Sequence, residues 1–205
     1  NKTVWIFAAV YLGLAVVSFF SYWAAGMSAF DAINHAFSVI ATGGFSTKNL
    51  SIAAFDSNLI NILTIIFMFL SSVHFGLIYM VFATRSLRPL NNPVLKFYVL
   101  TILIASLLVA LSLKMSSAGF TWGDSFMTGI FQVISFISTT GFAISDNNTW
   151  PLFACFIVVL VSIPCGMAGS TTGGIKSDRM LLMFKTIGQQ IKNSVHPSSI
   201  NQVHV

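Results

Sequence analysis

The sequence predicts an all-α integral membrane protein, and three observations predict it. Of its 205 residues, 56% are hydrophobic and only 7% are charged, with no glutamate, whereas a water-soluble domain carries about a quarter charged residues. Long uncharged stretches, at 3–30, 57–84, 97–113 and 147–175, approach or exceed the roughly 20 residues that a helix needs to cross a bilayer. Between them, a short capped segment followed by a glycine-containing turn occurs twice. Most of the surface is therefore expected to face lipid.

A repeat organises the chain. The first copy is expected to comprise a span (Val4–Ala25), a short helix (Phe30–Ile40), a turn (41–46) and a second span (Asn58–Ala83). The second is expected to comprise a span (Phe97–Leu113), a short helix (Ser125–Ile137), a turn (138–142) and a span (Pro151–Met167). Gly44 and Gly141 are the matched positions, 97 residues apart. This gives one repeat at 1–84, a loop at 85–96, a second repeat at 97–187 and a tail at 188–205.

The two short helices begin alike. Ser28-x-x-Asp31 and Thr121-x-x-Asp124 resemble capping boxes with Asp in place of Glu. A helix of about 11–14 residues is about 16–21 Å long, too short to cross a bilayer, so each is expected to be a re-entrant half-helix. Irregular backbone at membrane depth is tolerated only when it is enclosed by protein or lines a watery cavity. Each glycine turn therefore predicts a pore or an enclosed site.

The turns have the chemistry of a cation filter. The C-terminal end of a half-helix carries about half a negative charge, and the following turn can present carbonyl oxygens in place of an ion's hydration shell. Glycine permits close backbone approach, and threonine hydroxyls can extend the row of oxygens. Neither turn contains a carboxylate, which suits the weak, multiple sites that conduction needs. The candidate filter residues are Thr42, Gly43, Gly44, Thr139, Thr140 and Gly141.

The charges are placed as in a multi-pass membrane protein. Two regions rich in basic residues follow the second and fourth spans, at 85–96 and 176–192, and the positive-inside rule makes both cytoplasmic. Four of the five aspartates then fall outside, namely Asp31, Asp56, Asp124 and Asp146. This topology explains the net charge of +5 and removes the reason to expect a nucleic-acid partner.

A glycine-rich loop at 166–174 interrupts what would otherwise be one helix from Pro151 to about Ile187. Its glycines and Lys176 do not have the spacing of a phosphate-binding loop. Two interpretations remain: a flexible break packed against neighbouring helices, or an intramembrane gate whose glycines allow it to change position. The candidate gate residues are Gly166, Gly169, Ser170, Thr171, Thr172, Gly173, Gly174, Lys176 and Arg179.

Three motifs carry a family resemblance. ATGGFS at 41–46, STTGF at 138–142 and AGSTTGGIK at 168–176 resemble Trk-type subunits of the bacterial Trk/Ktr and plant HKT potassium transporter superfamily. Members of that superfamily have four span–half-helix–span repeats around one K⁺ channel-like pore. The chain resembles the second and third repeats, and the pair His196-Pro197 is also similar to the Trk branch.

The resemblance implies K⁺ uptake in a bacterial inner membrane, with filter turns toward the outside and the loop at 166–174 as a gate below them. Glycine at both matched positions is similar to potassium-selective members, because some sodium-permeable relatives have serine in the first repeat. K⁺ at the filter is the only metal ion expected, and no cofactor is expected in this chain. The implied partners are the remaining repeats, a second copy, a cytoplasmic nucleotide-binding ring protein and the bilayer.

The alternative function is secondary transport of Na⁺ or another small solute, because broken helices and repeats also occur in such transporters. An enzyme is not expected, because no nucleophile–base pair or paired-carboxylate site is evident. His35 and His74 are expected to be neutral, hydrogen-bonded residues at helix interfaces. Cys155 and Cys165 are expected to be packing residues.

Overall fold

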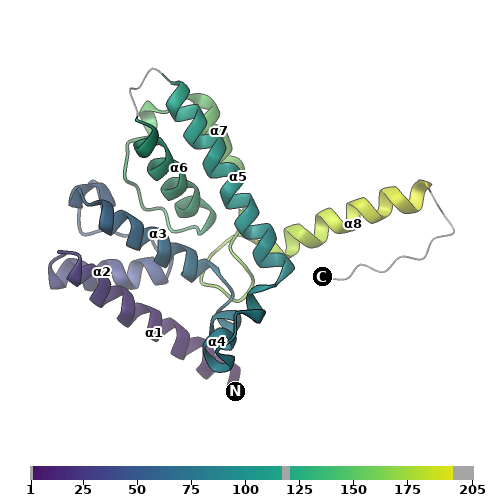
Figure 1. Ribbon diagram of the computed structural model, residues 1–205, viewed down its shortest axis with the longest axis horizontal. Helices are drawn as coiled ribbons and strands as arrows, with labels where there is room; N and C mark the ends of the chain where they lie inside the picture. Colours follow the sequence, from purple (N-terminus) through teal and green to yellow (C-terminus); the bar gives the residue numbers. More distant parts are fainter. Residues whose placement is uncertain (1, 117–120, 196–205) are drawn as a thin grey trace.

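The computed structural model describes residues 2–116 and 121–195. These residues form two groups of helices, and a last helix extends away from both (Figure 1). The first group contains α1 (Lys2–Ala24), α2 (Ala29–Ile40), the 3-10 helix η1 (Ser51–Phe55), α3 (Asn58–Ser72) and α4 (Phe75–Thr84). After η2 (Arg88–Leu90), the second group contains α5 (Pro93–Met115), α6 (Trp122–Ile137), η3 (Asn147–Thr149) and α7 (Leu152–Val161). The two-residue strands β1 (Pro164–Cys165) and β2 (Ile175–Lys176) precede the final helix α8 (Ser177–Val195).

The first span of each repeat is confirmed as one long apolar helix. Residues Thr3–Ala24 of α1 and Pro93–Met115 of α5 are long and apolar enough to cross a membrane. Asn92 caps α5, its side-chain oxygen accepting from the Val94 and Leu95 N–H groups, and Pro93 occupies the first turn, where a missing N–H costs nothing. The predicted fold class, an all-α membrane protein built from span–half-helix–span repeats, is therefore the observed one, apart from the short pairing of β1 with β2.

The second span of the first repeat is not the straight helix predicted over Asn58–Ala83. The axes of α3 and α4 differ by 98°, and the break falls at Val73 and His74. The freed backbone donors have other partners: Phe75 N–H donates to Gly169 O at 3.0 Å, and Gly76 N–H donates to His74 Nδ1 at 2.8 Å. The break is stable because these bonds replace those of a continuous helix.

The second span of the second repeat is also shorter than the predicted Pro151–Met167. Helix α7 ends at Val161, and at 1.5 Å per residue it is about 15 Å long, half the thickness of a hydrocarbon core. Pro164 cannot donate a helical hydrogen bond and instead lies in β1, which pairs in parallel with β2. The chain between β1 and β2 forms the glycine-rich loop.

Both predicted half-helices are present with their caps. The Ser28 hydroxyl accepts from Asp31 N–H at 3.0 Å, and the Thr121 hydroxyl accepts from Asp124 N–H at 3.2 Å. Each hydroxyl also donates a hydrogen bond to the side-chain carboxylate of the same aspartate. Helix α6 begins at Trp122, three residues before the predicted start, because the cap is Thr121.

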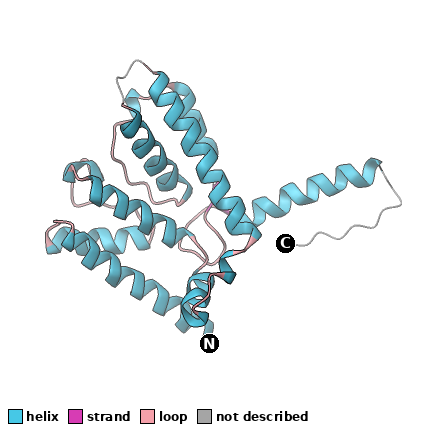
Figure 2. Cartoon of the chain, in the orientation of Figure 1, coloured by secondary structure: helices cyan, strands magenta, loops and turns pink. Residues whose placement is uncertain are grey.

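The two groups share one core, in which buried residues of α2, α3, α5 and α6 pack together. Figure 2 shows loops at the outer ends of the helices and further loop segments between the two helical groups. That region contains the segments that the sequence marked as functional.

Candidate functional site

The two predicted filter turns have the same backbone hydrogen bonds. Gly43 N–H donates to Ser38 O at 2.8 Å, and Thr140 N–H donates to Ser135 O at 2.9 Å. The two donors are 97 residues apart in the sequence, and so are the two acceptors, as the sequence repeat predicts. The preceding bonds keep the same offset, from Thr42 to Val39 and from Thr139 to Phe136. Both half-helices therefore end in the same way, which approximate sequence similarity alone did not guarantee.

The turns also share an uncommon backbone conformation. Thr42 has φ 53° and Thr139 has φ 56°, and the glycines two residues later, Gly44 and Gly141, have φ 68° and 85°. A left-handed conformation costs a non-glycine residue roughly 1–2 kcal/mol, and β-branched residues seldom adopt it. Such strain persists where surrounding contacts fix the backbone, often at functional sites. Its recurrence at matched positions marks both turns as one kind of site.

The two turns lie directly beside each other. A Cβ atom placed on Gly44 would overlap the carbonyl oxygen of Thr140, so only glycine fits here. A Cβ on Gly141 would meet no atom within 4 Å, although its positive φ still favours glycine. The first turn is thus packed against the second, and the corresponding side of the second turn is open.

The phenylalanines after the glycines show the same asymmetry. Phe142 is 1% exposed, and its ring stacks on His35 of α2 with centroids 5.8 Å apart. Phe45, its counterpart in the first turn, is 82% exposed. His35 is hydrogen-bonded as predicted, through Nδ1 to Asp31 O and through Nε2 to Ser46 Oγ. A half-helix therefore supports the turn of the following repeat.

The glycine-rich loop is attached to the end of α3. Thr171 bonds twice to Ser71 O, through its N–H at 3.3 Å and its hydroxyl at 3.0 Å. Met167 N–H donates to Ser72 O at 2.9 Å. These bonds use the carbonyl groups that the end of α3 leaves without helical partners.

The loop also contacts the first threonine of each predicted filter turn. The Thr42 hydroxyl lies 3.2 Å from Thr171 O, and Gly173 N–H donates to the Thr139 hydroxyl oxygen at 2.9 Å. That these hydroxyls extend the row of oxygens stays a prediction, and each of them also bonds to the loop. The loop is therefore placed against both turns.

Two charged residues fix the shape of the loop. The Lys176 ammonium donates to the carbonyl oxygen of Thr172 and, at 3.0 Å, to its hydroxyl. Asp178 accepts from Ala168 N–H at 2.6 Å.

Arg179, which was also predicted to belong to the gate, is exposed on the first turn of α8. It makes no hydrogen bond or ion pair within residues 2–116 and 121–195. Sequence reasoning missed Asp178, although an acid in the first turn of a helix is a recognisable signal of a favourable charge at the helix N-terminus.

An aspartate lies at the start of the first half-helix. The Thr47 hydroxyl, 2.5 Å from Asp31 Oδ1, and then the Ser28 hydroxyl hold the pKa of the Asp31 carboxyl below its usual range. Lys48 lies 3.5 Å away and acts in the same direction. A negative charge at a helix N-terminus is favourable, so Asp31 stays ionised at neutral pH.

The comparison with known families agrees with this geometry. The family model TrkH, described as a cation transport protein, matches residues 1–205. The chain belongs to the TrkH family. Two TrkH-family relatives are the Trk system potassium uptake proteins TrkH and TrkG of Escherichia coli strain K12, which are 36% and 33% identical to it. The alignments cover 98% and 100% of this chain, and 41% and 42% of those proteins.

A solved structure from the TrkH family has the same fold. The crystal structure of the potassium transporter TrkH from Vibrio parahaemolyticus superposes with a TM-score of 0.91 at 34% sequence identity. The match covers 100% of this chain and 44% of that one. The chain thus spans about two fifths of the length of the TrkH proteins that it matches.

Proposed function

We propose that this chain supplies two of the repeats that surround a K⁺ uptake pore. The observation that carries the proposal is the pair of turns that match bond for bond and meet where Gly44 faces the Thr140 carbonyl. The names of the relatives, Trk system potassium uptake proteins, support K⁺ as the ion.

In this proposal, each half-helix aims its partly negative C-terminal end at the ion path, and carbonyl groups of residues 42–44 and 139–141 replace water around a dehydrated ion. No carboxylate lies within either turn, so ions leave as readily as they enter. The glycine-rich loop is the gate, because it lies against Thr42 and Thr139 and is attached to α3 by bonds that can break.

The surroundings of the pore belong to the same proposal. Because the chain spans about two fifths of its relatives, the remaining repeats complete the ring, and a second copy and a cytoplasmic nucleotide-binding ring protein join the assembly. Filter turns face the outside of a bacterial inner membrane, while 85–96 and 176–205 face the cytoplasm, in keeping with the positive-inside rule.

The test is rubidium and sodium flux into liposomes that carry the full-length protein, with and without Gly44→Ser. A left-handed backbone costs serine roughly 1–2 kcal/mol, and the overlap with Thr140 adds to that cost. We expect rubidium flux, or the preference for rubidium over sodium, to fall at least about tenfold.

Gly13→Ser is the matched control, because a Cβ at this exposed glycine of α1 meets no atom within 4 Å. It should conduct like the unmodified protein. Absence of saturable cation flux in the unmodified protein, or normal flux and selectivity in a folded Gly44→Ser protein, would overturn the proposal.

A further inference from the structure

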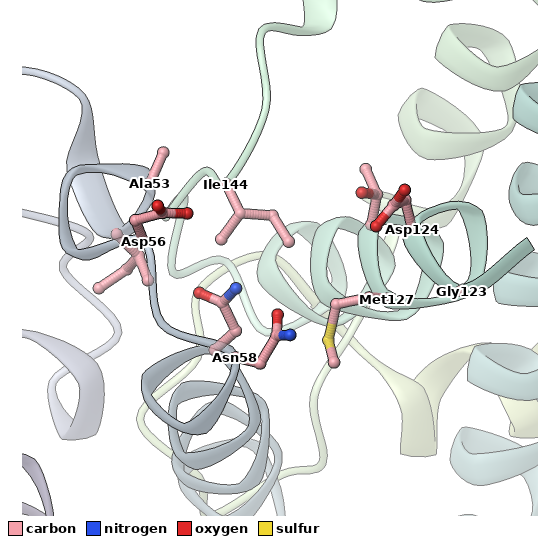
Figure 3. A pocket seen from close by; sticks show the side chains of 10 residues that line it. Ala53, Asp56, Asn58, Gly123, Asp124, Met127 and Ile144 are labelled. Atoms are coloured by element: carbon pink, nitrogen blue, oxygen red, sulfur yellow. The ribbon is translucent and has the colours of Figure 1, made fainter. Parts of the chain in front are cut away.

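A polar cavity lies at the end of the molecule where α3 and α6 begin. Its volume is about 390 Å³, and its polar lining residues are Asp56, Asn58, Asn61, Asp124 and Thr128. Figure 3 shows Asp56 and Asp124 on opposite sides of this cavity, with Asn58 and Ile144 between them. The lining contains two carboxylates and no basic residue.

Several polar groups in this cavity lack a protein partner. Thr128 is 6% exposed, and no hydrogen bond of its hydroxyl is recorded within the described residues. Asp56 takes part in no ion pair there either, and Asp124 bonds through its side chain to Thr121. Thr128 lines the cavity, so the cavity offers a donor as well as two acceptors to a ligand.

An apolar groove continues from the cavity along the helices. It has a volume of about 670 Å³ and is lined by side chains of α3, α5 and α6, among them Ile65, Leu103, Leu107 and Ile130. Gly123 and Met127 line both spaces. The combined site is therefore polar at its end and apolar along the length of the helices.

We propose that this site binds a membrane lipid whose headgroup carries an amine, namely phosphatidylethanolamine. The ammonium group would lie between Asp56 and Asp124, where two negative charges complement it. The amide groups of Asn58 and Asn61 and the hydroxyl of Thr128 are donors for phosphate or ester oxygens. An acyl chain would follow the groove past Leu103 and Leu107, because apolar surface along membrane-crossing helices faces hydrocarbon.

The arrangement favours a lipid over a simple cation. A hydrated ion would interact with the carboxylates alone and would not contact the apolar groove that continues from the cavity. An anionic lipid such as phosphatidylglycerol has no positive group for the two aspartates. A ligand with an amine at one end and a hydrocarbon chain at the other fits both the polar cavity and the apolar groove.

Native mass spectrometry of the full-length protein tests this, with equal amounts of phosphatidylethanolamine and phosphatidylglycerol. The unmodified protein should retain phosphatidylethanolamine with a preference of roughly twofold to fivefold, the range for exposed charge pairs. Asp56→Asn should remove that preference without disturbing the backbone, because asparagine tolerates the left-handed φ of 43°. Leu103→Trp should fill the groove and reduce retention of both lipids at the site.

Matched controls lie outside the site. Leu100→Trp changes an equally exposed leucine of α5, and Asp146→Asn changes an aspartate that does not line the cavity; both should behave like the unmodified protein. Equal retention of the two lipids, or Asp56→Asn and Leu103→Trp proteins indistinguishable from the controls, would overturn the proposal. Displacement of the lipid by free ethanolamine at matched concentration would also overturn it, because the groove would then contribute nothing. If Leu103→Trp does not fold, the Asp56→Asn comparison decides alone.

Discussion

Single hydroxyl groups connect the proposed gate to the proposed filter. Thr42 and Thr139 are held at positive φ in the turns, and both contact the glycine-rich loop. Each of these bonds fixes the orientation of a hydroxyl group in a turn that is proposed to bind the ion. Loop position and ion occupancy are therefore expected to influence each other, and such coupling is reciprocal.

Thr171→Val should release the loop without touching the filter. The change keeps the shape of the side chain and removes the hydroxyl that donates to Ser71 O. One hydrogen bond contributes about 1 kcal/mol, so basal rubidium flux should rise up to about fivefold. The measurement is flux into liposomes without any regulatory partner.

Thr171→Ser retains the hydroxyl and should restore the original rate. Thr84→Val is the control, because among residues 2–116 and 121–195 its hydroxyl bonds only to Met80 O in its own helix. Flux that is unchanged in Thr171→Val would show that this contact does not restrain the loop.

At the scale of the elements, the break between α3 and α4 is the feature that most changes the predicted architecture. Neither Val73 nor His74 is a helix breaker of the glycine or proline type. The break depends on His74, whose side chain caps α4, and on Gly169 O, which accepts from Phe75 N–H. The loop and the bend therefore support each other.

His74→Ala should destabilise this region by about 1 kcal/mol, the usual cost of losing an N-cap, because Gly76 N–H loses its acceptor. His74→Asn should recover most of that loss, because asparagine is a good N-cap. The denaturant midpoint of the purified full-length protein measures both. Equal destabilisation by the two changes would instead assign the effect to lost packing of the ring against Phe7.

At the scale of the whole molecule, the two repeats cover each other on one side only. Phe142 and the Gly44 position are each covered by the neighbouring repeat, whereas Phe45 and the Gly141 position are open. If each half-helix supports the following turn, Phe45 is expected to pack on the half-helix of the preceding repeat in the full-length protein.

Cysteine labelling tests this expectation. In a full-length protein with Cys155 and Cys165 replaced by alanine, Phe45→Cys should react with a polar maleimide at least about tenfold more slowly than Leu50→Cys, because burial excludes the reagent. Leu50 is a suitable reference, because it is 71% exposed in the nearby loop. Equal labelling rates would show that no repeat covers Phe45.

The sequence by itself determined the membrane class, the two long spans, both capped half-helices and the positions of the matched turns. These features are local: apolar length, a cap at Ser28 or Thr121, and a glycine that permits positive φ each act within a few residues of the chain. The tertiary structure alone decided the 98° bend after Val73 and the bonds of the Thr42 and Thr139 hydroxyls to the loop. Each of these depends on hydrogen-bond partners far away in the sequence, because a helix breaks, and a hydroxyl is occupied, only where the folded chain supplies another partner.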